Sequence, residues 1–276
     1  MATFPTHDPP TPLRPFVAAA HGYAVPANPT GLHRGLPSRH LTLVVELLAP
    51  LRLSGLGSPV AAHAVAGGLH TRPVLIDASA PQEGLQYALT PLGAEALLGL
   101  PASELAGRDL DLADLLPEAD RLVARLQETR SWAARFRLLD EALLARLAGR
   151  EVPAVRPEVA EAWRVIFRRG GQTRIGTVAT HVGWGRRHLA EQFRLVTGLT
   201  PREAVRIARF EHARGLLLRP GRPGLADVAA RAGYADQPHL AREWRALAGC
   251  SVGTWLREEL PFVQDGAHRT GAGSTS

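Results

Sequence analysis

The sequence predicts an α+β protein, with a β-rich N-terminal domain that also carries helices and an all-α C-terminal domain built on a repeat. Three observations support this prediction. A run of apolar and β-branched residues at 41–47 is typical of a strand. From residue 91 onward, apolar residues recur at spacings of three and four, which is the period of a helix. Two segments in the last third of the chain match each other at an offset of 50 positions.

The N-terminal half divides into an arm, a β-rich region and a helical region. Residues 1–15 are rich in Pro and Thr and predict a loose arm. Residues 16–83 contain short apolar runs separated by Gly and Pro, which favours strands, and residues 86–89 predict one more. Helical spacing predicts helices at 91–100, 122–128, 133–147 and 158–168.

A stretch of Gly, Pro and charged residues at 149–157 interrupts the helical pattern and marks the predicted domain boundary. We expect an N-terminal domain at 1–150, then a linker and first helix at 151–170. The helical domain follows at 171–265. The small polar residues at 266–276 predict a disordered tail.

Composition limits the class of protein. The chain has 276 residues, 45% of them hydrophobic and 21% charged, which suits two domains with packed cores. No apolar run approaches the roughly 20 residues that span a bilayer, and the N-terminus lacks the pattern of a secretion signal. Cys250 is the only cysteine, which excludes an intramolecular disulfide and a cysteine-based metal cage. We expect a cytoplasmic protein without a cofactor.

Basic residues concentrate in the second half of the chain. Residues 1–150 contain 13 Arg against 14 Asp and Glu, whereas residues 151–276 contain 19 Arg against 12. A basic half joined to a near-neutral half favours a polyanion-binding domain with a separate partner domain. Charge alone does not identify the polyanion.

The repeat lies within the basic half. Val178–Trp184 aligns with Val228–Tyr234 at an offset of 50, and after one inserted residue His188–Arg194 aligns with His239–Arg245. Each copy predicts two helices joined by a tight turn, because a glycine stands where the turn needs a positive φ. Each second helix has apolar residues at i and i+4 that bury one face.

Two helix-turn-helix units joined by a long helix are therefore the predicted architecture of the C-terminal domain. The opposite, exposed face of each second helix is free to reach base edges. It carries Arg186, Arg187 and Glu191 in the first unit and Gln237, Ala241 and Arg242 in the second.

The connecting helix has a clear predicted start. Thr200-Pro201-Arg202-Glu203 fits a capping box, with Thr at the N-cap and Glu at N3. About 18 residues at 1.5 Å each make a rod of roughly 27 Å. Such a rod can hold two recognition helices about one duplex turn (~34 Å) apart. The two helices would then read two different DNA segments whose centres are about 10–10.5 bp apart.

The stretch Ala226–Arg245, followed by Gly249-Cys250-Ser251, resembles the AraC/XylS family of transcription regulators. The resemblance covers about 100 residues and implies a domain of seven helices. Three positions depart from the family pattern: Gly185 stands in place of a capping Ser, Ala235 replaces a second Ser and leaves Asp236 as the cap, and Val252 replaces a common Pro.

The resemblance also implies DNA-reading residues. Position by position, base contacts would fall on Arg187, Ala190 and Glu191 in the first unit and on Gln237, Ala241 and Arg242 in the second. Arg pairs with guanine, Gln with adenine, and Glu accepts from cytosine. Arg186, Arg194 and Arg245 are expected to meet phosphate or solvent rather than bases. Glu191 has an alternative role, in which it neutralises a neighbouring Arg.

The N-terminal half more loosely resembles the partly cupin-like sensor regions of actinobacterial members of this family. The residues that carry this resemblance are 31–43, 90–94 and 259–265. It implies a sensor or dimerisation domain. The expected partners are double-stranded DNA, with RNA polymerase, a small-molecule effector and a second copy of the chain as further candidates, and no membrane.

Other function classes stay open. An N-terminal enzyme with the helical repeat as an attachment, or a repeat that binds protein, would also fit the composition. Ser38, Ser54 and Ser58 lack the context of a catalytic nucleophile, so we expect no enzyme. The four histidines at 33, 40, 63 and 70 lack the spacing of metal ligands, so we expect no metal.

Overall fold

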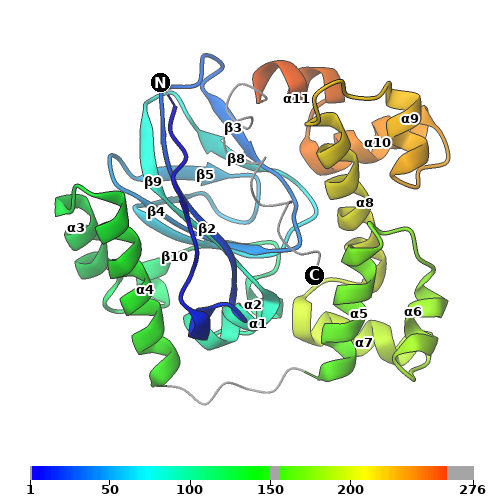
Figure 1. Ribbon diagram of the computed structural model, residues 1–276, viewed down its shortest axis with the longest axis horizontal. Coiled ribbons are helices and arrows are strands. Elements are labelled where there is room, and N and C mark those ends of the chain that lie inside the picture. Colours follow the sequence, from blue (N-terminus) through cyan, green and yellow to red (C-terminus); the bar gives the residue numbers. More distant parts are fainter. Residues whose placement is uncertain (1, 150–155, 260–276) are drawn as a thin grey trace.

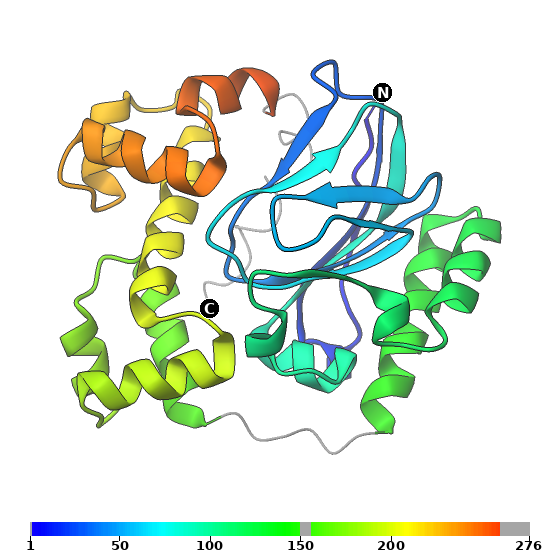
Figure 2. The same cartoon turned by 180° about the vertical axis from the view of Figure 1, so that it is seen from behind.

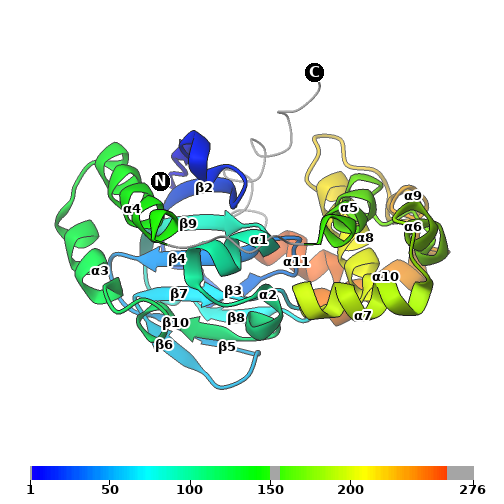
Figure 3. The ribbon, with the colours of Figure 1, turned by 90° about the horizontal axis from the view of Figure 1, so that it is seen from below.

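The computed structural model describes residues 2–149 and 156–259. A β-rich N-terminal domain packs beside a helical C-terminal domain, and helices α3 and α4 lie at the end of the β-domain farthest from it (Figures 1 and 3). The predicted α+β fold is confirmed. No helix in the described ranges is both long and apolar enough to cross a bilayer.

Two antiparallel sheets form the β-domain. The larger has the strand order β1-β2-β9-β4-β7-β10 and the smaller the order β3-β8-β5-β6. Figure 2 shows the smaller sheet in front of the larger. The strands are β1 (Thr6–His7), β2 (Val17–Val25), β3 (Leu32–Gly35), β4 (Leu41–Glu46), β5 (Leu51–Ser54), β6 (Val60–Ala62), β7 (Ala64–Gly67), β8 (Val74–Asp77), β9 (Gln82–Leu89) and β10 (Asp109–Asp111).

Strand β4 shows why the larger sheet forms. Leu41, Leu43 and Val45 alternate along it and are almost completely buried, so they place one face of the strand in the large core cluster. Val44 lies between them in sequence, faces the other side of the sheet, and pairs in register with Gln86 of β9 and Val65 of β7. A smaller buried cluster then joins the two sheets through Val65 and residues of the four-stranded sheet.

The helices of the β-domain are short except for the last two. They are the 3-10 helix η1 (Thr11–Leu13), α1 (Pro91–Gly93), the π-helix η2 (Ala94–Leu98), α2 (Ala102–Leu105), the 3-10 helix η3 (Leu112–Asp114), α3 (Ala119–Glu128) and α4 (Trp132–Ala148). The predicted helix at 91–100 is thus only partly α-helical. It changes to a π-turn and ends at Gly99, which has a φ of +82°.

The prediction of a loose N-terminal arm is wrong. Strand β1 pairs with β2, and Leu13 is completely buried. The ring of His7 stacks on Phe136 of α4 at 4.5 Å, and its Nε2 lies 2.6 Å from Asp140 Oδ2. These two contacts fix the arm to helix α4.

Within the described residues 156–259, the C-terminal domain has seven helices, as the family resemblance implied. They are α5 (Pro157–Arg168), α6 (Ile175–His181), α7 (Arg186–Thr197), α8 (Pro201–Leu217), α9 (Leu225–Arg231), α10 (Gln237–Ala248) and α11 (Val252–Glu258). The expected domain limits stay a prediction, and the tail at 266–276 lies outside the described residues.

The boundary between the two largest buried clusters does not follow the boundary between the domains. One large cluster runs from the β-domain through α5, α6 and α7 to Ala208 of α8. A second cluster begins at Phe210 of α8 and includes α9, α10 and α11. The first helix-turn-helix unit therefore shares its core with the β-domain.

Candidate nucleic-acid interface

The first helix-turn-helix unit consists of α6, a turn at Gly183 and α7. Gly183 has a φ of +75°, the left-handed region that only glycine adopts without strain. Its N–H donates to the carbonyl of Thr180, and the N–H of Trp184 donates to Ala179 over 2.9 Å. Leu189 and Phe193 of α7 are completely buried, which directs the opposite face of the helix outward.

The second unit repeats this geometry with α9, a turn at Gly233 and α10. Gly233 has a φ of +79°, and Tyr234 donates to Ala229 over 2.9 Å. Leu240 and Trp244 occupy the buried positions that Leu189 and Phe193 have in the first unit. The sequence repeat therefore corresponds to a repeat of backbone hydrogen bonds.

The two recognition helices start differently. Asp236 caps α10, because its Oδ1 accepts a hydrogen bond of 2.6 Å from the N–H of His239. This is the substitute cap that the sequence suggested. Helix α7 begins at Gly185, which has no side chain to cap it. The N-terminal N–H groups of α7 are thus free to bind another acceptor, such as phosphate.

On α7, the predicted base-reading residues share the outward face. Arg187 has a side chain 93% exposed, and Glu191 one turn later has a side chain 53% exposed. Their side chains form an ion pair of 2.9 Å, which raises the pKa of Arg187 through the hydrogen bond to Glu191. Ala190 beside them is half-buried. This ion pair is compatible with the neutralising role of Glu191, and its role toward DNA stays a prediction.

On α10, Gln237 and Arg242 are exposed and Ala241 is half-buried. Across the described ranges, Arg242 forms no ion pair. The first unit thus presents an Arg–Glu pair, whereas the second presents an exposed guanidinium and, in its first turn, an exposed amide. The three residues assigned to phosphate, Arg186, Arg194 and Arg245, are all exposed.

Helix α8 connects the two units as predicted. Thr200 and Glu203 form both hydrogen bonds of the capping box, with Thr200 N–H donating to Glu203 Oε2 over 2.7 Å. Sequence reasoning missed the ion pair between Arg206 of α8 and Glu243 of α10, which measures 2.7 Å. No local pattern indicates a pair between two helices 37 residues apart.

The helical repeat also matches a known family of domains. A family model described as a helix-turn-helix domain matches residues 178–258, from the middle of α6 to the end of α11. This match supports the resemblance of the C-terminal region to helix-turn-helix domains of the AraC type. Among curated proteins, none matches the sequence.

Solved structures of ToxT from Vibrio cholerae resemble both domains together. ToxT from strain O395 is 9% identical, with 94% of this chain and 97% of that chain covered and a TM-score of 0.52. A second crystal structure of ToxT is also 9% identical, covers 94% and 98%, and has a TM-score of 0.54. ToxT from strain SCE256 bound to an unsaturated fatty acid is 9% identical, covers 91% and 97%, and scores 0.50. At this identity the likeness shows a shared fold.

A helix-turn-helix domain of the AraC type is typical of DNA-binding transcription regulators. The two recognition helices are the elements of such a domain that enter the major groove.

Carboxylates of the AraC-type domain attach it to the β-domain. Glu259, just after α11, is completely buried and accepts three hydrogen bonds from residues of β3. The donors are His33 Nδ1 at 2.7 Å, the Arg34 N–H at 3.0 Å and Arg34 Nη1 at 3.2 Å. Glu258 adds a bond of 2.8 Å to the same guanidinium.

A second charged contact lies nearer the middle of α8. Glu211 accepts from both the backbone N–H and the Nε of Arg39, at 2.9 and 2.8 Å. Burial lowers the pKa of the neighbouring His40 to about 4, so this ring is neutral at pH 7. Helix α2 of the β-domain packs against α7, where Gly198 leaves no room for a Cβ beside Ser103 and Ala106.

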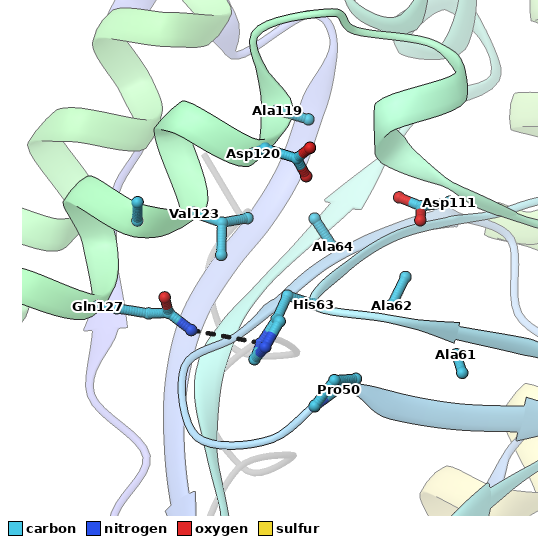
Figure 4. Close-up of a pocket in the computed structure, with 11 residues that line it drawn as sticks. Pro50, Ala61, Ala62, His63, Ala64, Asp111, Ala119, Asp120, Val123 and Gln127 are labelled. Atoms are coloured by element: carbon cyan, nitrogen blue, oxygen red, sulfur yellow. Dashed lines mark hydrogen bonds between the residues drawn. The ribbon is translucent and has the colours of Figure 1, made fainter.

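A shallow hollow of about 350 Å³ lies in the β-domain, away from the AraC-type domain. It opens between β6–β7 and α3, where Asp111 and Asp120 line it from different elements (Figure 4). His63 Nδ1 lies 3.0 Å from the Glu46 carbonyl, and Gln127 Nε2 lies 3.4 Å from the same nitrogen. Two carboxylates at its wall make this hollow unsuited to an anion.

The four histidines considered as metal ligands lie apart in the structure. His33 bonds Glu259, His63 bonds the Glu46 carbonyl, and His70 Nδ1 lies 2.5 Å from the Arg72 carbonyl. The described residues contain no group of three or more His, Cys, Asp or Glu side chains placed to hold one ion.

Proposed function

We propose that the chain is a sequence-specific regulator whose helices α7 and α10 read two adjacent, different segments of major groove on one face of the duplex. The observation that carries this proposal is the repeated turn geometry, which presents both recognition helices with their predicted reading residues exposed or half-buried. A helix placed this way contacts bases through its first turns.

The chemistry of the two faces supports different readings of DNA. Arg242, without an ion-pair partner, is suited to the two acceptors of guanine, and Gln237 to adenine. Arg187 must exchange its bond to Glu191 for a base, and Glu191 is then suited to the amino group of cytosine. The bound site is therefore asymmetric, with segments 10–10.5 bp apart between centres.

The β-domain supplies regulation in this proposal, through a small-molecule effector or through pairing with a second chain. ToxT, which has a similar fold, has been solved with an unsaturated fatty acid bound. Contact with RNA polymerase would follow from DNA binding next to a promoter. The protein would act in the cytoplasm, where its DNA lies.

Selection of bound sequences from a random duplex pool tests the proposal. We expect the full chain to enrich two short, unlike segments separated by one helical turn, and inserting five base pairs between them to abolish joint binding. The Arg187→Ala/Arg242→Ala double variant should lose this enrichment. Arg121→Ala/Arg125→Ala removes the same charge from exposed positions of α3 and should keep it.

Two outcomes would count against this function. Affinity that does not fall with increasing salt would exclude phosphate contacts and favour a repeat that binds protein. Enrichment of one segment alone would show that only one unit reads DNA.

A further inference from the structure

Helix α8 is not the only connection between the two helix-turn-helix units. The turn at residues 169–172, which joins α5 to the first helix of the first unit, extends to the turn of the second unit. At its end, Gln172 Nε2 donates a hydrogen bond of 2.7 Å to the carbonyl of Arg231, the last residue of α9.

The backbone of this turn is shaped for close contact with α8. Gly170 and Gly171 have φ values of +55° and +71°. A Cβ on Gly171 would lie 2.5 Å from the Val205 carbonyl oxygen and 2.9 Å from the Arg209 nitrogen. The Gly171 carbonyl accepts from Arg209 Nε at 3.1 Å. Only glycine at this position lets the turn lie directly on the middle of α8.

The second unit has a matching space. A Cβ on Gly233 would lie 2.9 Å from Gln172 Cγ, so the glycine of the second turn also admits the Gln172 side chain. Arg231 contributes one of the last carbonyls of α9, which has no partner within the helix itself. The side-chain amide of Gln172, in the turn between α5 and α6, donates to this carbonyl.

We propose that Gln172 is a positioning residue that fixes the orientation of α10 relative to α7, so that both recognition helices fit DNA in a single register. A single rod fixes the distance between two units, whereas a second connection away from its axis also prevents rotation about it. Gln172 touches no DNA in this arrangement. The proposal rests on the proposed bipartite reading of DNA.

The test uses the full chain and duplexes carrying the sequences selected by the wild-type protein. Binding is measured on the bipartite site, on each segment alone, and on bipartite sites with the spacing changed by one base pair either way. For Gln172→Ala we expect roughly a three- to tenfold loss on the bipartite site, the range for one hydrogen bond. The preference for one spacing should weaken, and affinity for each single segment should stay as in wild type.

Two further variants test whether the lost hydrogen-bond donor of Gln172 causes the effect. Gln172→Glu replaces the donor by a carboxylate facing the Arg231 carbonyl and should resemble Gln172→Ala. Gln127→Ala removes the same side chain from the β-domain and should bind as wild type does. Melting temperature is measured for all three, because a positioning role leaves it nearly unchanged for an exposed residue.

The outcomes separate the two proposals. If the wild-type chain prefers one spacing and Gln172→Ala keeps the same affinity and preference, the inference on Gln172 is wrong while the bipartite function stands. Loss of single-segment binding in Gln172→Ala would also overturn it, since the residue would then support the fold. A wild-type chain without spacing preference refutes the proposed function itself.

Discussion

Replacing Glu259 by alanine should weaken the attachment of the AraC-type domain to the β-domain. The carboxylate is completely buried and accepts three hydrogen bonds from His33 and Arg34. The Arg34 side chain is only 12% exposed, so the variant leaves a guanidinium in a poorly hydrated place. Removing one partner of a buried ion pair costs about 3–5 kcal/mol.

Part of that cost is offset by Glu258, which keeps its bond of 2.8 Å to Arg34. We therefore expect Glu259→Ala to lower the free energy of unfolding of the full chain by about 2–3 kcal/mol. Urea is the denaturant to use, because guanidinium chloride would screen the ion pair.

Glu258→Ala is the matched control, since its side chain is 26% exposed and holds only one of the four bonds. It should cost less than about 1 kcal/mol. Urea midpoints for the two variants that coincide within error, or a Glu259→Ala cost below about 0.5 kcal/mol, would refute this reading of the contact.

Three other perturbations have defined expected results. Arg242→Ala should cost on the order of 1–3 kcal/mol of binding free energy on the selected DNA site and relax the base preference at one or two positions. Arg186→Ala should weaken binding to all sequences alike and reduce the slope of log affinity against log salt concentration by about one. Binding titrations at several salt concentrations measure both effects, and an interchange of the two profiles would contradict the assignment. Asp236→Ala removes the cap of α10 and should lower the free energy of unfolding by about 0.5–2 kcal/mol. Gly185→Ser adds a cap to α7 and should not lower the free energy of unfolding. Equal changes in melting temperature for the two variants would contradict the cap assignment. Burial raises the pKa of Asp109 from 3.8 to about 6, so its folded-state pKa lies above the unfolded value and stability is lost as the pH rises through about 6. The stability of Asp109→Asn should then match that of wild type near pH 4 and exceed it by up to about 2 kcal/mol at pH 8. Urea unfolding across the pH range measures this difference. A difference in stability that does not change with pH would exclude this carboxyl as the cause.

The parts of the structure that were predictable from sequence are those set by local signals. The capping box at Thr200, the cap at Asp236 and the two turn glycines each depend on residues within four positions of one another. The repeat added independent support, because two segments with the same pattern fold in the same way. The exposed faces of α7 and α10 followed from the spacing of the buried residues.

The parts that sequence reasoning missed depend on contacts between distant residues. His7 meets Asp140 across 133 positions, and this contact orders an arm whose composition favours disorder. His33 and Glu259 are 226 positions apart. Strand β10 has three residues and owes its form to pairing with β7, so no periodicity could indicate it. Such elements are determined by tertiary packing rather than by local preference.

The boundary between the two large buried clusters lies within α8, between Ala208 and Phe210, and not between the domains. Cooperative unfolding follows shared buried contacts, so the first helix-turn-helix unit should open together with the β-domain and the second unit by itself. Amide exchange and limited proteolysis would then divide the chain at the middle of α8. Separating the domains at the linker would expose apolar surface on the first helix-turn-helix unit, whereas the second would keep its own apolar core and lose the hydrogen bonds of Glu259 to His33 and Arg34.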